Sequence, residues 1–87
     1  MVGRIANQPM IVLIDGGSTH NFVQARLVRH LGLTAQPTQP LCVVVGNGNV
    51  VLCHQLCVGV TINIQDKDFT MDLHALPLCG ADVILGV

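Results

Sequence analysis

The fold of this chain is most constrained by a run of five apolar residues, 10–14, that ends in a carboxylate and two glycines, Asp15-Gly16-Gly17. An uninterrupted apolar run of this kind is typical of a strand buried on both faces. A carboxylate at the end of such a strand loses hydration unless backbone amides turn back toward it, and glycines permit so sharp a turn. We therefore expect the turn to hold Asp15 in place, with the hydroxyls of Ser18 and Thr19 within reach. The alternative is an ordinary turn without chemistry, because Asp-Gly pairs mark turns in many β-rich proteins.

The N-terminal half predicts a hairpin followed by one short helix. Residues 2–6 alternate weakly and lead through a turn at 7–9 into the strand at 10–14. Residues 21–32 carry apolar side chains on one helical face, with Ser18 or Thr19 suited to cap the start and Gly32 suited to the end. Two prolines within 34–40 predict a loop there.

The C-terminal half predicts strands joined by tight turns. A strand at 41–45 and a second from Val50 flank an Asn-Gly pair at 47–48, which is a strong hairpin signal. Residues 58–64 and 69–73 alternate with period two around a turn at 65–67. A loop at 76–81 precedes a last apolar run at 82–87. Six or seven strands and one helix predict a compact, mostly β domain.

Composition narrows the function classes. The 87 residues are 51% hydrophobic and 10% charged, which predicts a single domain, 1–87, that covers part of its surface with another copy or domain. A net charge of −1 and the absence of Trp and Tyr argue against nucleic-acid binding. No apolar run reaches the roughly 18–20 residues of a membrane span. The N-terminus has no secretory-signal pattern, so we expect an intracellular, cytoplasmic and reducing location.

Four cysteines raise the question of metal binding, since Cys53, His54 and Cys57 lie close together in sequence. There is no CxxC pair and no second pair at a zinc-module spacing. We interpret the thiols as small core hydrophobes and expect no metal and no cofactor. A zinc module remains the alternative. The full set is Cys42, Cys53, Cys57 and Cys79.

Three segments together resemble the retropepsins, the retroviral-type aspartic proteases. They are 12–22, which contains the Asp-Gly-Gly-Ser turn, 45–48, which contains a Gly-tipped hairpin, and 76–86, which ends in an apolar-apolar-Gly run. The likeness covers essentially the whole chain and is greatest to the protease segment of gypsy-like LTR retrotransposon polyproteins, especially those of plants. It implies the retropepsin-like acid protease fold, a small closed β-barrel with a flap hairpin and one short helix.

The resemblance also implies residue roles. Asp15 corresponds to the catalytic aspartate, Gly17 to the glycine whose amide solvates it, and Ser18 to the residue that hydrogen-bonds the outer carboxylate oxygen. The active-site loop comprises Gly16, Gly17, Ser18 and Thr19. The flap tip corresponds to Gly46, Asn47 and Gly48, and the hydrophobic-glycine loop beneath the catalytic turn to Ile84, Leu85 and Gly86.

The implied activity is that of an aspartic endopeptidase acting on a peptide or polyprotein substrate. With one such aspartate per chain, the active form is a homodimer whose paired carboxylates activate a water. The chain departs from the family at Gly16, where a Ser or Thr normally hydrogen-bonds across the dimer axis, and it ends at Val87, before the family's last core segment. The alternative is a catalytically degenerate domain that serves as a dimerisation or peptide-binding module.

The remaining acidic and imidazole side chains fit structural positions. Asp82 is expected to cap or end a loop. His20, near the turn, is interpreted as a surface or helix-start residue, with contact to substrate or to the partner chain as the alternative. The rest are expected on solvated turns or polar strand faces: Asp66, Asp68, Asp72, His54 and His74.

Overall fold

A computed structural model of the protein describes residues 1–44, 48–78 and 80–87. Within these residues the chain forms strands and one short helix, as the sequence predicts. In chain order the elements are β1 (Val2–Ile5), β2 (Gln8–Asp15), β3 (Phe22–Gln24), α1 (Ala25–His30), β4 (Ala35–Val44), β5 (Val50–Ile64), β6 (Lys67–Leu76) and β7 (Val83–Gly86).

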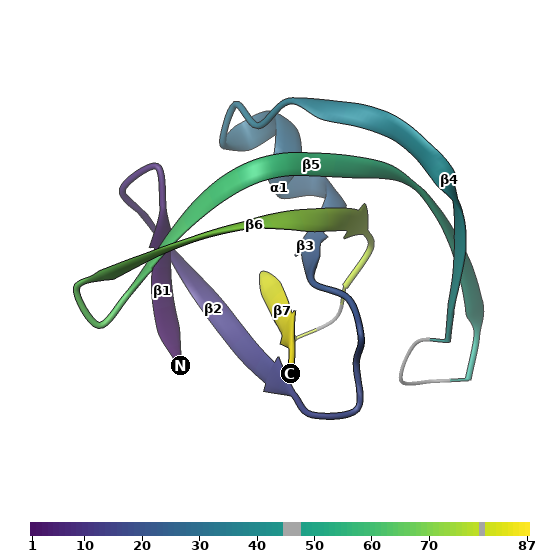
Figure 1. Ribbon diagram of the computed structural model, residues 1–87, viewed down its shortest axis with the longest axis horizontal. Coiled ribbons are helices and arrows are strands. Elements are labelled where there is room, and N and C mark those ends of the chain that lie inside the picture. Colours follow the sequence, from purple (N-terminus) through teal and green to yellow (C-terminus); the bar gives the residue numbers. More distant parts are fainter. Residues whose placement is uncertain (45–47, 79) are drawn as a thin grey trace.

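Six of these strands close into a barrel (Figure 1). The hydrogen-bonded order is β1-β2-β7-β3-β6-β5, and an additional pairing of β1 with β5, through Arg4 and Asn63, closes the ring. β4 pairs with β5 from outside the ring and is an edge strand. The predicted closed barrel with one short helix is therefore confirmed.

The barrel core is apolar and is filled from one face of each strand. Its largest fully buried side chains are Ile62, Leu73, Val12, Val23 and Val83, and Leu76 is buried in a second cluster with Phe22 and Cys53. The prediction that the strand at 10–14 is buried on both faces is wrong. Met10 and Val12 are buried, whereas Ile11 and Leu13 are 56% and 52% exposed. A barrel wall has one inner face, and no second layer within the described residues covers the outer face of β2.

The predicted helix is shorter than expected because its first turn belongs to the barrel. Residues 22–24 form β3, which runs parallel to β6 and antiparallel to β7. The helix begins at Ala25 with Gln24 as its N-cap residue, so the prediction that Ser18 or Thr19 caps it is wrong. Gly32, with φ of 70°, follows the helix end, as the sequence predicts.

The prediction of a loop over 34–40 is also wrong, because β4 runs through Pro37 and Pro40. Proline cannot donate a ladder hydrogen bond, but an edge strand can present that position to solvent. The register between β4 and β5 shifts between Pro37 and Leu41, which accommodates both rings. The two prolines therefore bend this strand without interrupting it.

β5 is one strand of 15 residues with an irregularity between Cys57 and Val60. Gly59 has φ of 69° there, and its N–H donates to Asp72 Oδ1 at 3.0 Å. The extra residue changes the phase of the alternation, so Val58, expected to face inward, is 53% exposed. Val60 and Ile62 are buried, as the alternation predicts.

The three predicted hairpins are present. Two of them turn through residue pairs with positive φ, Ala6-Asn7 and Gln65-Asp66; the first turn therefore precedes the predicted 7–9. In the third, Val44 of β4 pairs with Val50 of β5. Gly48 has φ of 85°, and the other predicted flap-tip residues, Gly46 and Asn47, lie outside the described residues.

Two cysteines are core residues, as we interpreted them. Cys53 and Cys57 are both buried, and burial, with a smaller effect of Cys53, raises the pKa of the Cys57 thiol. For Cys42 that interpretation is wrong, because this residue is exposed on the edge strand β4; Cys79 lies outside the described residues. Across residues 1–44, 48–78 and 80–87, no three His, Cys, Asp or Glu side chains are grouped to hold a metal ion. The single described helix is too short to span a membrane.

Candidate active site

The turn after β2 holds the carboxylate of Asp15 with a backbone amide. The N–H of Gly17 donates to Asp15 Oδ1 at 2.9 Å, and the N–H of Ser18 donates to the Asp15 carbonyl at 3.3 Å. This is the folding back of amides that the glycines predict. The carboxylate itself is exposed, so it is available to a ligand or to a second chain.

The hydroxyls of the turn brace the loop itself. Ser18 Oγ donates to the carbonyl of His20 at 2.8 Å and accepts from the His20 N–H at 3.3 Å. Thr19 Oγ1 lies 2.9 Å from His20 Nδ1. In this single chain the Ser18 hydroxyl therefore bonds within the loop, rather than to the Asp15 carboxylate as the resemblance implies.

β7 packs beneath the turn and fixes the position of the turn's backbone. β2 and β7 run parallel with Asp15 opposite Gly86. A Cβ at Gly86 would lie 2.5 Å from the Ser18 carbonyl oxygen and 2.7 Å from that of His20, so only glycine fits. The Gly86 N–H donates to Asn21 Oδ1 at 2.9 Å, and the Val87 N–H donates to the Asp15 carbonyl at 3.2 Å.

The predicted hydrophobic-glycine segment is thus brought together with the predicted turn. Leu85 points into the barrel core and is buried, whereas Ile84 is half-buried and faces the groove described next. Gly86 supplies the close backbone contact. Successive residues of a strand face opposite sides, so Leu85 faces the core while Ile84 and Gly86 lie on the other face.

An apolar groove of about 680 Å³ opens beside the turn. Asp15, Gly17 and Ser18 line one part of it. The remaining lining residues come from β2, the turn after it, β3, β4, the end of β6, the segment after β6, and β7: Leu13, His20, Phe22, Leu41, Cys42, Val43, Val44, Leu76, Pro77, Leu78 and Ile84. Among the described lining residues Asp15 is the one carboxylate. The groove can therefore hold an extended apolar ligand against a single acid.

Sequence reasoning missed most of the groove wall. The apolar pattern predicts Leu13 as core, and Leu41 and Val43 as ordinary strand residues. A signal was present, because the last four residues of β4, 41–44, are all apolar although that strand lies at an edge. Interpreting these residues as a ligand-facing surface requires the tertiary structure, in which β4 lies across from the turn.

Three rings cluster at one end of the groove. His20 lies with its ring centroid 5.2 Å from that of His74 and 6.4 Å from that of Phe22. Cys53 Sγ lies 3.9 Å from His74 Nδ1. Burial lowers the pKa of His74, the nearby His20 lowers it further, and Asp72 opposes both. His74, expected on a polar strand face, is instead part of this cluster, and His20 lines the groove.

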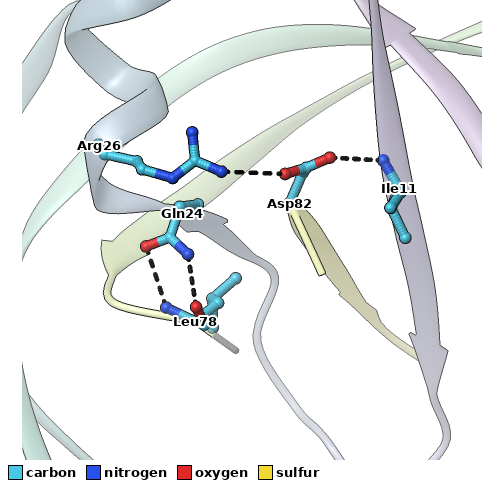
Figure 2. Close-up of polar contacts among 5 residues, drawn as sticks. All are labelled: Ile11, Gln24, Arg26, Leu78 and Asp82. Atoms are coloured by element: carbon cyan, nitrogen blue, oxygen red, sulfur yellow. Dashed lines mark hydrogen bonds and ion pairs between the residues drawn. The ribbon is translucent and has the colours of Figure 1, made fainter. Parts of the chain in front are cut away.

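The segment after β6 is anchored by side chains (Figure 2). Gln24 Nε2 donates to the Leu78 carbonyl at 2.5 Å, and the Leu78 N–H donates to Gln24 Oε1 at 3.0 Å. Further on, Asp82 Oδ2 accepts from the Ile11 N–H at 2.7 Å, and its Oδ1 lies 3.8 Å from Arg26 Nη2. Asp82 thus ends the loop by tying it to β2, as the sequence predicts.

Two solved structures share this fold. The retroviral protease-like domain of Ddi1 from Leishmania major matches with a TM-score of 0.71 at 15% identity, covering 98% of this chain and 68% of that chain. EIAV protease in complex with the inhibitor HBY-793 matches with a TM-score of 0.66 at 19% identity, covering 99% of this chain and 78% of that chain. The closed barrel with its Asp-Gly-Gly turn is therefore a retropepsin-like fold.

Sequence comparison identifies the family. The family model for retroviral aspartyl proteases matches residues 2–87. This chain belongs to the retroviral aspartyl protease family. Comparison with curated proteins finds no match.

Proposed function

We propose that this chain is an aspartic endopeptidase that acts as a homodimer, with Asp15 of each copy supplying one of two catalytic carboxylates. The observation that carries the proposal is the held but exposed Asp15 carboxylate at the wall of an apolar groove. In the same proposal, residues 16–19 form the active-site loop, residues 46–48 the flap tip, and residues 84–86 the support beneath the loop.

Exposed apolar side chains near the turn support a dimer. Both chain ends lie against β2, since the Val12 N–H donates to the Met1 carbonyl and the Val87 N–H to the Asp15 carbonyl (Figure 1). The large exposed hydrophobics of this region are Met1, Val2, Ile11, Leu13, Ile14 and Val87. A second copy that covers them would bring the two Asp15 turns together on a two-fold axis.

Two adjacent carboxylates cannot both ionise readily, so the pair holds one proton between them. The ionised member takes a proton from a bound water, whose oxygen attacks the scissile carbonyl carbon. The protonated member donates its proton to the carbonyl oxygen. When the tetrahedral intermediate collapses, the C–N bond breaks and the leaving nitrogen receives a proton from the dyad.

The proposed substrate is an extended polypeptide, laid along the groove between the turn and β4. The resemblance to gypsy-like LTR retrotransposon proteases of plants supports a polyprotein of such an element as the natural substrate, and processing inside the cell. The chemistry needs neither a metal nor a cofactor, because the carboxylate pair supplies both the base and the acid.

The test is cleavage of an unstructured protein at pH values from about 3 to 7, the range in which a carboxylate pair titrates. Wild type is compared with Asp15→Asn and with Asp66→Asn, which removes an exposed carboxylate in a hairpin turn outside the groove. We expect cleavage by wild type and Asp66→Asn and none by Asp15→Asn. Adding Asp15→Asn protein to wild type should inhibit cleavage, because mixed dimers contain one intact carboxylate.

A second candidate function is a peptide-binding or dimerisation module without catalysis. Gly16 favours it, because this position carries no hydroxyl to bond across the proposed axis. Equal cleavage by wild type and Asp15→Asn, at concentrations where sedimentation shows a dimer, would reject the endopeptidase and leave the module.

A further inference from the structure

One side chain fixes the part of the groove wall that residues 76–78 form. β6 ends at Leu76, where Gln24 of β3 is its register partner. The next residue, Pro77, has no N–H and cannot extend the ladder. Leu76, Pro77 and Leu78 all line the groove, so the wall continues past the end of the sheet.

Beyond the point where the pairing of β3 with β6 ends, the Gln24 side chain supplies the next hydrogen bonds. Its carboxamide donates to the Leu78 carbonyl at 2.5 Å and accepts from the Leu78 N–H at 3.0 Å, while its backbone N–H donates to the Asp82 carbonyl at 2.8 Å. The side chain therefore imitates one further rung of a β-ladder. Both ends of the segment 78–82 are held from this single residue.

The position of Gln24 in the helix supports this reading. Gln24 is the N-cap residue of α1, where Ser, Thr, Asp or Asn normally bonds the first free amides. Its side chain makes no capping hydrogen bond. The first turn of α1 therefore has no side-chain cap, because the Gln24 carboxamide bonds Leu78 instead.

We propose that Gln24 is a positioning residue that sets the side-chain selectivity of the groove by holding Leu78, favouring peptides with a branched apolar residue at the scissile bond. This inference rests on the proposed function for its substrate. When Leu78 is fixed, it forms with Leu76 and Ile84 a preformed apolar wall for the peptide's apolar side chain. If Leu78 were mobile, part of the binding free energy of each peptide would be spent on ordering it.

The test separates binding from cleavage by using the Asp15→Asn protein. Two peptides that differ in one residue at the scissile position, Leu or Ala, are titrated against this parent and against the same protein with Gln24→Leu. We expect the parent to prefer the Leu peptide and the added Gln24→Leu to reduce that preference about tenfold. Gln39→Leu, at an exposed position of β4 outside the groove lining, is the matched control and should keep it.

Gln24→Glu supplies a rescue that a merely structural role would not give. A protonated carboxyl has one donor and one acceptor, like the carboxamide, whereas a carboxylate has no donor. The Leu preference should be retained near pH 3.5 and reduced near pH 6.5, on either side of an ordinary Glu pKa of about 4.3. Asp82 and Arg26, the charged groups nearby, are present in the parent, which controls for them.

Hydrogen exchange at the Leu78 amide shows whether each variant has lost its bond. The proposal is overturned if Gln24→Leu accelerates this exchange and leaves the Leu preference unchanged. It is also overturned if the parent has no Leu preference. A parent preference that Gln24→Leu reduces, without cleavage by wild type, would reject the proposed catalysis and uphold the role of Gln24.

Discussion

The two segments that border the groove are held in different ways. The turn at 15–20 is joined to β7 by backbone groups, the Val87 amide and the close approach of Gly86, and its own hydroxyls brace it from within. The segment at 78–82 depends on the side chains of Gln24 and Asp82, beside the backbone hydrogen bonds that Asp82 makes with Gln24 and Ile11. Backbone contacts leave little room for substitution, whereas side-chain contacts can be changed one at a time.

The difference matches what each segment would have to do. A catalytic carboxylate must sit at a fixed height relative to its partner, because small displacements of reacting groups reduce the rate strongly. A wall that selects side chains can vary with the substrate. Each of the following experiments tests one side of this comparison.

Gly86→Ala should give the largest effect. Its Cβ would lie 2.5 Å from the Ser18 carbonyl oxygen, a backbone atom that can move only with the whole turn. We expect the free energy of unfolding, measured by urea denaturation, to fall by about 3 kcal/mol, at the upper end for overpacking. Gly16→Ala is the matched control, because a Cβ there meets nothing within 4 Å. Equal stability of the two variants would show that β7 does not support the turn.

Gly16→Ser should strengthen the proposed dimer. The position has open space for a side chain and no positive φ is recorded for it, so the hydroxyl adds without strain. In the proposed dimer two such hydroxyls could hydrogen-bond across the axis, each contributing about 1 kcal/mol. Sedimentation equilibrium should show a dimer dissociation constant at least about tenfold lower. An unchanged constant, with Gly16→Ala as control, would place this residue away from the dimer axis.

Asp82→Ala should destabilise the side-chain-held segment by about 1–2 kcal/mol, because the Ile11 N–H loses its acceptor. Arg26→Ala removes the ion pair alone. Arg26 is exposed and its contact with Asp82 is 3.8 Å long, so we expect a loss of less than about 0.5 kcal/mol. Urea denaturation of both variants measures the difference. Equal losses would mean that the charge, rather than the hydrogen bond to β2, anchors Asp82.

Much of this architecture was predictable from local sequence. The alternation in 60–64, the turn after Ile64 and the glycine after the helix each depend on neighbours along the chain, and the family's motifs located the Asp15 turn. The errors arose where tertiary context decides. Pro37 is tolerated because β4 is an edge strand, and Leu13 is exposed because nothing in the described part of the chain covers the outer face of β2.

The site shows the same division. The contact between the Gly17 amide and Asp15 spans two residues, and the glycine pattern predicts it. The Gln24–Leu78 bond spans 54 residues and joins two side-by-side strand ends. No local pattern distinguishes this glutamine from the others in the chain. The groove wall could therefore not be predicted before the barrel topology was known.

The smallest expected effect concerns the ring cluster, where pH acts on stability. Burial and His20 lower the pKa of His74 in the folded state below its ordinary value of about 6.5. Between that lowered pKa and 6.5 the unfolded chain binds the additional proton, so stability rises with pH through this window and is lost as pH falls through it. His74→Gln should flatten this part of the profile in urea denaturation between about pH 5 and 8. His54→Gln, which changes an exposed histidine on β5, should leave it unchanged. If the profile keeps its slope without His74, another group carries the pH dependence, and the ring cluster would then contribute packing at the groove but no acid sensitivity.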